Sequence, residues 1–277
     1  MQLLQFDEVK KIFFQIYNRI KDFSDIEIMQ NSSDSIIEQF KILDSMAAIP
    51  VDDLFVRTLE KDPDLKSVIV EISRFRKLYN IKLEIERAEL ILSSNTPWKI
   101  VENFTFYRNY LELARMEVKG ANLCKGDHIV FLGSGPLPLS LIILCKCYGV
   151  TGTGIEQDLE YVNISKRIIN KLNMSDEINI LHGNHFNLPL QAETQLIMIA
   201  AAAIPKQEIF AHLNKVLKKG TKASYRIYEK GLRKFLDVDS SVEHNNLNDT
   251  WGNFKEYKRI RPEPPVNNTC IFLTKSR

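Results

Sequence analysis

Two glycines and an acid in the middle of the chain have the residue types and the spacing of a ligand-binding turn. Gly133 and Gly135 follow an apolar run at 129–132 that predicts a buried strand, and an apolar, helix-like segment follows at 138–148. Glycines at such a turn let a ligand approach the backbone, and the free N–H groups of the helix start can hold a negatively charged group. Glu156 ends a second predicted strand about twenty residues later, where it can accept hydrogen bonds from both hydroxyls of a ribose. This stretch predicts the front half of a nucleoside-binding α/β domain.

The glycine turn differs from a full dinucleotide fingerprint. Pro138 stands where that fingerprint has its third glycine, so the close helix-to-strand packing of a pyrophosphate site is missing. Ser134 and Pro136 complete the turn. The departure favours a cofactor without phosphates, of the S-adenosylmethionine type. Another nucleotide and a purely structural turn remain the alternatives.

The longest predicted helix, over 64–93, carries an acid on its apolar face. Helical steps of three and four place four apolar residues on one inward stripe, namely Ile81, Ile85, Ala88 and Ile91. Glu84 falls on the same stripe, whereas Lys82, Glu86 and Glu89 are expected to face outward. Glu84 can therefore be a buried partner of an arginine, or a base toward an amine whose pKa is raised by desolvation.

Two tyrosines begin the next predicted helix. Tyr107 and Tyr110 lie three residues apart among other aromatic residues, and each hydroxyl needs a partner if it is buried. Spacing alone allows either tyrosine to serve a site or to pack in the core.

Further candidates lie near the ends of later predicted strands. Alternation of strands and helices after residue 126 predicts a parallel sheet, with ligands over the carboxyl ends of its strands. The amide of Asn184 could contact an adenine edge there or form an Asx turn. Arg226, next to Tyr225, could bind a substrate carboxylate through two parallel hydrogen bonds or form a surface salt bridge. Asn268 precedes the last predicted strand.

Composition argues against several classes of function. With 37 basic and 35 acidic residues the net charge is +2, so no whole-chain field attracts nucleic acid or an anionic membrane. We find no signal peptide and no apolar run that could span a bilayer, and expect a cytoplasmic protein. The four cysteines lack zinc or CxxC spacing, and His182 and His185 lack further ligands nearby, so we expect reduced thiols, loop histidines and no metal site.

Six segments together resemble one family. The chain contains LGSGPLPLS, GIEQD, KLEIE, FYRNYLEL, SYRIYEKG and PVNNT, and in these it resembles nicotianamine synthase, above all its archaeal and bacterial forms. The resemblance extends from about residue 65 to the C-terminus, with a weaker echo before it. It implies a Rossmann-like S-adenosylmethionine-dependent methyltransferase fold at 121–277, preceded by an all-helical domain at 1–120 that covers the active site.

The resemblance also implies a reaction and the residues that perform it. Family members transfer the aminobutyryl chain of S-adenosylmethionine to an amine, release 5'-methylthioadenosine and build nicotianamine, a metal chelator. Glu84 matches the catalytic glutamate of the family, and Tyr110 matches the tyrosine beside the reacting amine, with Tyr107 the less favoured partner. The cofactor positions are Gly133, Ser134, Gly135, Pro136 and Glu156, with Asn184 in the place where many enzymes of this fold have an acid. Tyr225, Arg226 and Asn268 are the candidates for the amino-acid end of a substrate.

Three alternatives stay open from the sequence. The α/β half alone would suit an S-adenosylmethionine-dependent methyltransferase. A single transfer to histidine, as in the synthases of opine metallophores, would use the same chemistry. A non-catalytic relative of the fold would be expected to lack Glu84, which is present. The acceptor, the number of transfers, the oligomeric state and the chelated metal cannot be predicted from the sequence.

Overall fold

The structure, a computed structural model, describes residues 6–30, 33–47, 49, 51–189, 194–228, 231–236, 251–263, 266 and 268–276. The chain forms two compact units, one of residues 1–83 with 228–241 and the other of residues 84–227 with 242–277. None of the helices in the described part of the chain is long and apolar enough to cross a membrane.

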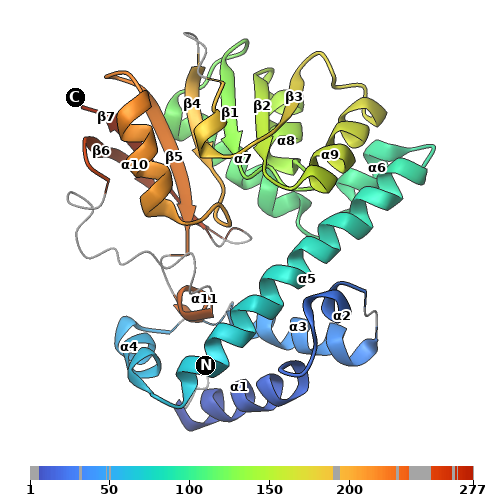
Figure 1. The fold of residues 1–277 in the computed structure, drawn as a ribbon, viewed down its shortest axis with the longest axis vertical. Helices are drawn as coiled ribbons and strands as arrows, with labels where there is room; N and C mark the ends of the chain where they lie inside the picture. Colours follow the sequence, from blue (N-terminus) through green and yellow to red (C-terminus); the bar gives the residue numbers. More distant parts are fainter. Residues whose placement is uncertain are drawn as a thin grey trace. The chain divides into compact units, whose positions relative to one another are not determined.

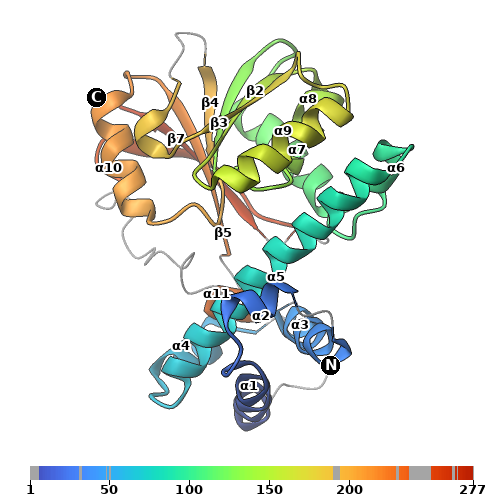
Figure 2. The ribbon, with the colours of Figure 1, turned by 45° about the vertical axis from the view of Figure 1, so that its right-hand side comes forward.

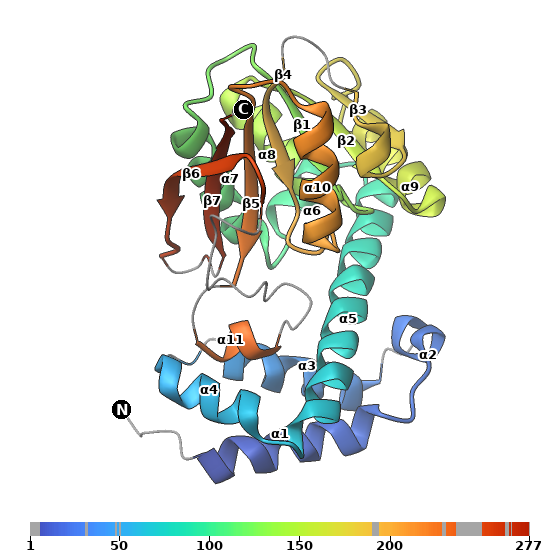
Figure 3. The ribbon, with the colours of Figure 1, turned by 60° about the vertical axis from the view of Figure 1, so that its left-hand side comes forward.

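The first unit is helical, as the sequence predicts for this part of the chain. It contains α1 (Phe6–Ile20), α2 (Asp25–Gln30), α3 (Asp34–Ala47), α4 (Asp53–Lys61), the start of α5 (Leu65–Ser93) and α11 (Gly231–Leu236). Residues at helical spacing on α1, including Val9, Phe13 and Ile16, are buried in one core with residues of α3, α5 and α11. Figure 2 shows α1 and α3 around the start of α5, and Figure 3 shows α11 beside α3 and α4.

A seven-stranded sheet forms the centre of the second unit (Figure 1). Its strands are β1 (His128–Leu132), β2 (Thr151–Glu156), β3 (Ile178–His182), β4 (Thr194–Ile199), β5 (Lys222–Ile227), β6 (Phe254–Ile260) and β7 (Thr269–Lys275). The order is β3-β2-β1-β4-β5-β7-β6, with β1 to β5 parallel and β7 antiparallel to its neighbours β5 and β6. This is the Rossmann-like methyltransferase arrangement that the sequence predicts.

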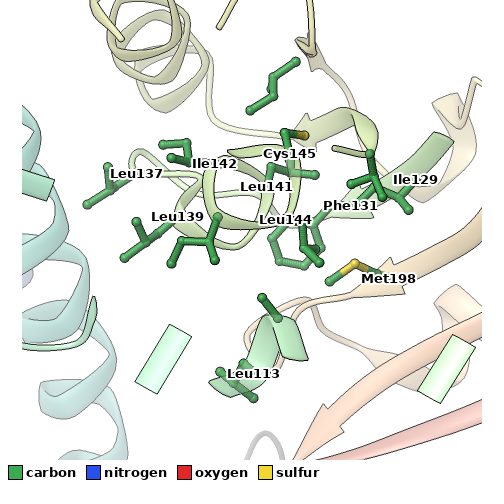
Figure 4. Packing of buried hydrophobic residues seen from close by; sticks show 14 of the residues in the cluster. Leu113, Ile129, Phe131, Leu137, Leu139, Leu141, Ile142, Leu144, Cys145 and Met198 are labelled. Atoms are coloured by element: carbon green, nitrogen blue, oxygen red, sulfur yellow. The ribbon is translucent and has the colours of Figure 1, made fainter. Parts of the chain in front are cut away.

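The helices of the second unit cover both faces of this sheet. Besides the end of α5 from Glu84 on, they are α6 (Pro97–Glu102), α7 (Tyr107–Ala121), α8 (Leu139–Tyr148), α9 (Leu159–Lys171), the short 3-10 helix η1 (His185–Asn187) and α10 (Lys206–Val216). Alternate strand residues enter different cores: Ile129 and Phe131 of β1 pack with α7, α8 and α9, whereas Val130 and Leu132 pack with α10. Figure 4 shows the first of these cores, where Leu113 of α7 and the leucines of α8 gather near β1.

Helix α5 agrees closely in its bounds with the predicted helix over 64–93, but its burial follows the prediction only in part, because Ile81 and Ile85 of the inward stripe are half-buried. Ala88 and Ile91 are buried on the predicted stripe. Lys82 is also buried, and its Nζ donates to the carbonyl of Met29 (3.2 Å), so our expectation that it faces outward is wrong. The aliphatic stem of a lysine can line a core while its ammonium finds an acceptor.

The compact units do not divide the chain at residue 120. Helix α7 contacts β6, β7 and α8, which places it in the unit of the sheet although it precedes β1 in the chain. The domain boundary near residue 120, which follows the change from helices to strands, stays a prediction.

Candidate functional site

The glycine turn after β1 has a backbone that favours glycine. Gly133 and Gly135 have φ angles of +79° and +71°, a region in which a Cβ is strained. The N–H groups of Gly133 and Ser134 both donate to the carbonyl of Ile155, at 2.9 and 3.1 Å, which ties the turn to the end of β2. Pro136 is buried beside them. The turn is therefore held rigidly at the carboxyl ends of β1 and β2.

One atom of this turn lacks a partner. The Oγ of Ser134 is buried, and no described residue forms a hydrogen bond with it. A buried hydroxyl without a partner is unfavourable, and a ligand with a polar group at this position would satisfy it. The turn thus combines an open backbone with an unused polar atom.

Glu156, the last residue of β2, faces the glycine turn. Its Oε2 accepts a hydrogen bond from the N–H of Gly135 (3.0 Å), and its Oε1 accepts one from the N–H of Asp158 (3.0 Å). These two bonds fix the orientation of the carboxylate. Each carboxylate oxygen has a further lone pair, so both can still accept a bond from a ligand hydroxyl.

Glu84 approaches the same glycine from helix α5. A Cβ built on Gly135 would lie 3.1 Å from the Oε2 of Glu84, so the missing side chain leaves room for this carboxylate. The hydroxyl of Tyr110 donates to the Oε1 of Glu84 over 3.4 Å. Burial, reinforced by the negative charge of Glu156 and opposed by the Tyr110 hydrogen bond, raises the pKa of Glu84 from 4.5 to about 8. The structure thus brings Glu84, Tyr110, Gly135 and Glu156 together.

The two tyrosines of α7 have different surroundings. Tyr110 contacts Glu84, as described, whereas Tyr107 lies at the first position of α7 near Cys147 and Glu102. Burial, with these two neighbours, raises the pKa of the Tyr107 phenol. Tyr110 is therefore the better placed of the two for chemistry at Glu84.

Arg226 and Asn268 each contribute a buried donor atom that has no partner among the described residues. The Nη2 of Arg226 and the Nδ2 of Asn268 are both enclosed, and the two residues are only 5% and 7% exposed. Arg226 pairs with Cys270 across β5 and β7, and Asn268 lies just before β7. Two unused donors near one end of this strand pair could hold an anionic group.

The structure does not bring Tyr225 to these donors. Successive strand residues point to opposite faces of a sheet, so Tyr225 faces away from Arg226. It is fully buried with Phe210 and Trp251, and its hydroxyl accepts a hydrogen bond from the indole N–H of Trp251 (3.3 Å). Tyr225 is a core residue of the face that α10 covers.

Asn184 and the nearby histidines lie at the carboxyl end of β3. The Oδ1 of Asn184 accepts from the N–H of Phe186 (2.9 Å) and caps η1, which is the Asx-type arrangement considered from the sequence. An adenine contact of Asn184 stays a prediction. In the described part of the chain, no three histidine, cysteine or acidic side chains are grouped as metal ligands.

Two charged residues that sequence reasoning missed also belong to this region. Lys206 is buried, and its Nζ donates to the carbonyls of Ala200, Ala201 and Ala203, in the loop that packs against Gly133. Glu117 of α7 is 1% exposed. The burial of Glu117 could have been predicted from the sequence, because this residue lies at helical spacing between Leu113 and Ala121 on an apolar stripe.

Comparisons with known proteins show which proteins this chain resembles. A family model described as nicotianamine synthase protein matches residues 4–277. The L-histidine 2-aminobutanoyltransferase of Yersinia pestis is 21% identical over 65% of this chain, and the match spans 66% of that protein, a little under two thirds of its length. A crystal structure of MtNAS in complex with MTA and tNA superposes with a TM-score of 0.86 and 25% identity over 100% of both chains.

A further crystal structure, of a glutamate-to-glutamine mutant of MtNAS in complex with S-adenosylmethionine, has the same fold. It superposes with a TM-score of 0.83 and 24% identity, again over 100% of both chains. Because the family model covers nearly the whole sequence, this chain belongs to the nicotianamine synthase protein family.

Proposed function

We propose that this protein is a transferase that moves the 3-amino-3-carboxypropyl (aminobutyryl) group of S-adenosylmethionine to an amine, releases 5'-methylthioadenosine and builds a nicotianamine-like metal chelator. Membership of the nicotianamine synthase family supports the proposal. The similarity of the chain to an L-histidine 2-aminobutanoyltransferase, and to MtNAS in complex with MTA and tNA, supports it as well.

The residues around the glycine turn fit the adenosyl part of S-adenosylmethionine. Gly133, Ser134, Gly135 and Pro136 would line it, with the unpartnered Oγ of Ser134 as a polar contact. Glu156 would accept hydrogen bonds from the ribose hydroxyls, since its carboxylate is already oriented by two backbone N–H groups. Asn184, at the end of β3, would lie near the adenine.

The main support for the proposal is the carboxylate of Glu84. It lies beside Gly135 and near the charge of Glu156, and one of its oxygens accepts a hydrogen bond from Tyr110. An amine of the acceptor attacks the γ carbon of the aminobutyryl chain, and an N–C bond forms as the C–S bond breaks. The electron pair of that bond returns to sulfur and converts the sulfonium to a neutral thioether. The proton released by the amine passes to Glu84.

The raised pKa of Glu84 suits this role. A base with a pKa of about 8 is matched to the proton of an ammonium group far better than an ordinary glutamate. Tyr110 would orient the carboxylate and the incoming amine, with Tyr107 as a more distant substrate contact. A sulfonium is already a good leaving group, so the reaction as proposed relies on orientation and proton removal and assigns no role to a metal.

The acceptor would be bound by its amino-acid end. Arg226 and Asn268 provide the two unpartnered donors for a carboxylate. We therefore propose that the acceptor is a free amino acid, or another small molecule that carries both an amine and a carboxylate. The net charge is only +2, so we propose that the protein acts on small molecules and not on nucleic acid or membranes. We also propose that it works in the cytoplasm.

The test is product identification by mass spectrometry. The purified protein is incubated with S-adenosylmethionine, alone and with L-glutamate or L-histidine. We expect 5'-methylthioadenosine and products heavier by aminobutyryl groups, and the number of groups added separates one transfer from several. Formation of S-adenosylhomocysteine with a methylated acceptor would instead show a methyltransferase.

A further inference from the structure

Glu117 is a buried acid of the second unit that the proposed reaction does not use. It lies on α7 and is 1% exposed. A carboxylate removed from water in this way costs several kcal/mol unless it is paired and hydrogen-bonded. The residues that contact Glu117 should therefore indicate the role of this buried carboxylate.

Two donors of strand β5 satisfy this carboxylate. The Nε of Arg226 donates to one oxygen of Glu117 (3.2 Å), and the hydroxyl of Ser224 donates to the other (2.8 Å). Ser224 and Arg226 are two apart on the strand, so both point to the face of the sheet that α7 covers. Although burial opposes the charge of Arg226, the carboxylate of Glu117 raises the pKa of its guanidinium, which therefore stays charged.

The guanidinium of Arg226 is fixed at two of its three nitrogens. Its Nη1 donates to the Oγ of Ser140 at the start of α8 (3.0 Å), and its Nε is held by Glu117. Phe131 lies under the group, with the guanidinium carbon 5.7 Å from the ring centroid. Only Nη2 remains, buried and without a partner among the described residues. Because the guanidinium is planar, fixing two nitrogens also fixes the direction of the third.

Glu117 is also tied to the candidate catalytic residues. It lies seven residues after Tyr110 on the same helix, so two turns bring both side chains to one face of α7. The negative charge of ionised Tyr110 would also raise the pKa of the Arg226 guanidinium, after the larger effect of Glu117. The ion pair thus joins α7 to β5 beside the site.

We propose that Glu117 is a positioning residue for the acceptor: it holds Arg226 so that its free Nη2, together with the Nδ2 of Asn268, receives the carboxylate of the acceptor amino acid. The inference rests on the proposed function. It adds the requirement that the length of the Glu117 side chain sets the affinity for this carboxylate. S-adenosylmethionine binding at the glycine turn should not depend on it.

The experiment measures how well the enzyme distinguishes a carboxylate from its amide. The full-length protein is assayed for 5'-methylthioadenosine release with L-histidine or L-glutamate, whichever is turned over, and with the corresponding α-carboxamide. The ratio of the two kcat/KM values is compared among the parent protein, Glu117→Asp, Glu117→Gln and Glu112→Asp. Glu112 is the matched control, because it lies on the same helix and pairs at the surface with Arg115.

The expected results depend on length and not on charge. Aspartate is too short to hold both Arg226 and Ser224, so Glu117→Asp should lower the ratio about tenfold, the loss of one hydrogen bond to a charged group. The KM for S-adenosylmethionine should change less than about twofold, because the glycine turn is untouched. Glutamine keeps the length: its one acceptor oxygen can hold the Nε of Arg226 while its NH2 group donates to the Oγ of Ser224, so Glu117→Gln should stay within about threefold of the parent ratio. Glu112→Asp should match the parent.

Distinct results would overturn this inference or the proposed function. An unchanged ratio in Glu117→Asp, or equal losses in the aspartate and glutamine variants, would exclude positioning by side-chain length. If Glu117→Asp does not fold, Ser140→Ala removes the other hold on Arg226 and should lower the ratio about threefold; an unchanged ratio there also overturns the inference. A parent protein that releases no 5'-methylthioadenosine with either amino acid would refute the proposed function itself.

Discussion

Replacing Glu84 by glutamine should stabilise the protein in alkaline solution. The folded protein favours the neutral acid, because burial raises the pKa of Glu84 from 4.5 to about 8. Between these values the folded state binds more protons than the unfolded chain, so this group's contribution to stability falls as the pH rises. Glutamine has the shape of the neutral acid and does not ionise. The variant should therefore escape this loss.

The size of the effect follows from the pKa change. Each pKa unit corresponds to about 1.4 kcal/mol, which sets a ceiling of about 5 kcal/mol above pH 8. The carboxylate of Glu84 is deeply placed, but the residue as a whole is half-buried and can relax toward water, so about 2 kcal/mol is the realistic gain. For a chain of 277 residues this corresponds to a rise in Tm of about 4 °C.

Thermal denaturation at several pH values between 4.5 and 9, at constant ionic strength, measures this gain. Glu84→Gln should have nearly the Tm of the parent protein at pH 4.5 and exceed it progressively toward pH 9. Glu89→Gln is the matched control, because Glu89 is exposed on the same helix, and its Tm should follow the parent. A Glu84→Gln variant that loses stability at pH 9 would refute the idea that the site destabilises the charged carboxylate.

Three other substitutions test the rest of the site. Tyr110→Phe removes the hydrogen bond that favours ionised Glu84, so the acidic limb of the kcat/KM profile, on which activity rises as Glu84 ionises, should move to higher pH and activity at pH 7 should fall about fivefold. An unmoved profile would show that Tyr110 does not influence the ionisation of Glu84. Gly135→Ala places a methyl group 3.1 Å from the Oε2 of Glu84 at a φ of +71°, which should cost about 1–2 kcal/mol in urea denaturation. Full stability there would contradict the geometry. Glu156→Gln should weaken S-adenosylmethionine binding about tenfold by calorimetry and lower the pKa of Glu84. An affinity equal to that of the parent protein would contradict a contact between Glu156 and the ribose.

Strong periodicity in the sequence predicted most of the fold. The apolar run predicted at 129–132 is β1, and the helix-like segment predicted at 138–148 is α8, each within a residue of the expected bounds. The long helix ending near residue 93 is α5. These elements are local, so their residue patterns suffice to predict them.

The candidate site was predicted only where single residues carry a signal. Glu84 stood out because an acid interrupted an apolar stripe, and the structure places it beside Gly135. Tyr225 and Arg226 were grouped by adjacency, although strand alternation separates them onto opposite faces. The partner of Arg226 could not be predicted, because Glu117 is 109 residues away in sequence and the pairing depends on how α7 packs on the sheet.

The role of Glu84 as the base is tested most directly by measuring binding and transfer in the same samples of Glu84→Gln and the parent protein. Calorimetry gives the affinity for S-adenosylmethionine, and mass spectrometry of the quenched reaction gives the 5'-methylthioadenosine formed. We expect the variant to bind S-adenosylmethionine within about tenfold of the parent and to lose at least about 100-fold in transfer rate, as for removal of a general base. Transfer at the parental rate by the variant would contradict the assignment of Glu84 as the base.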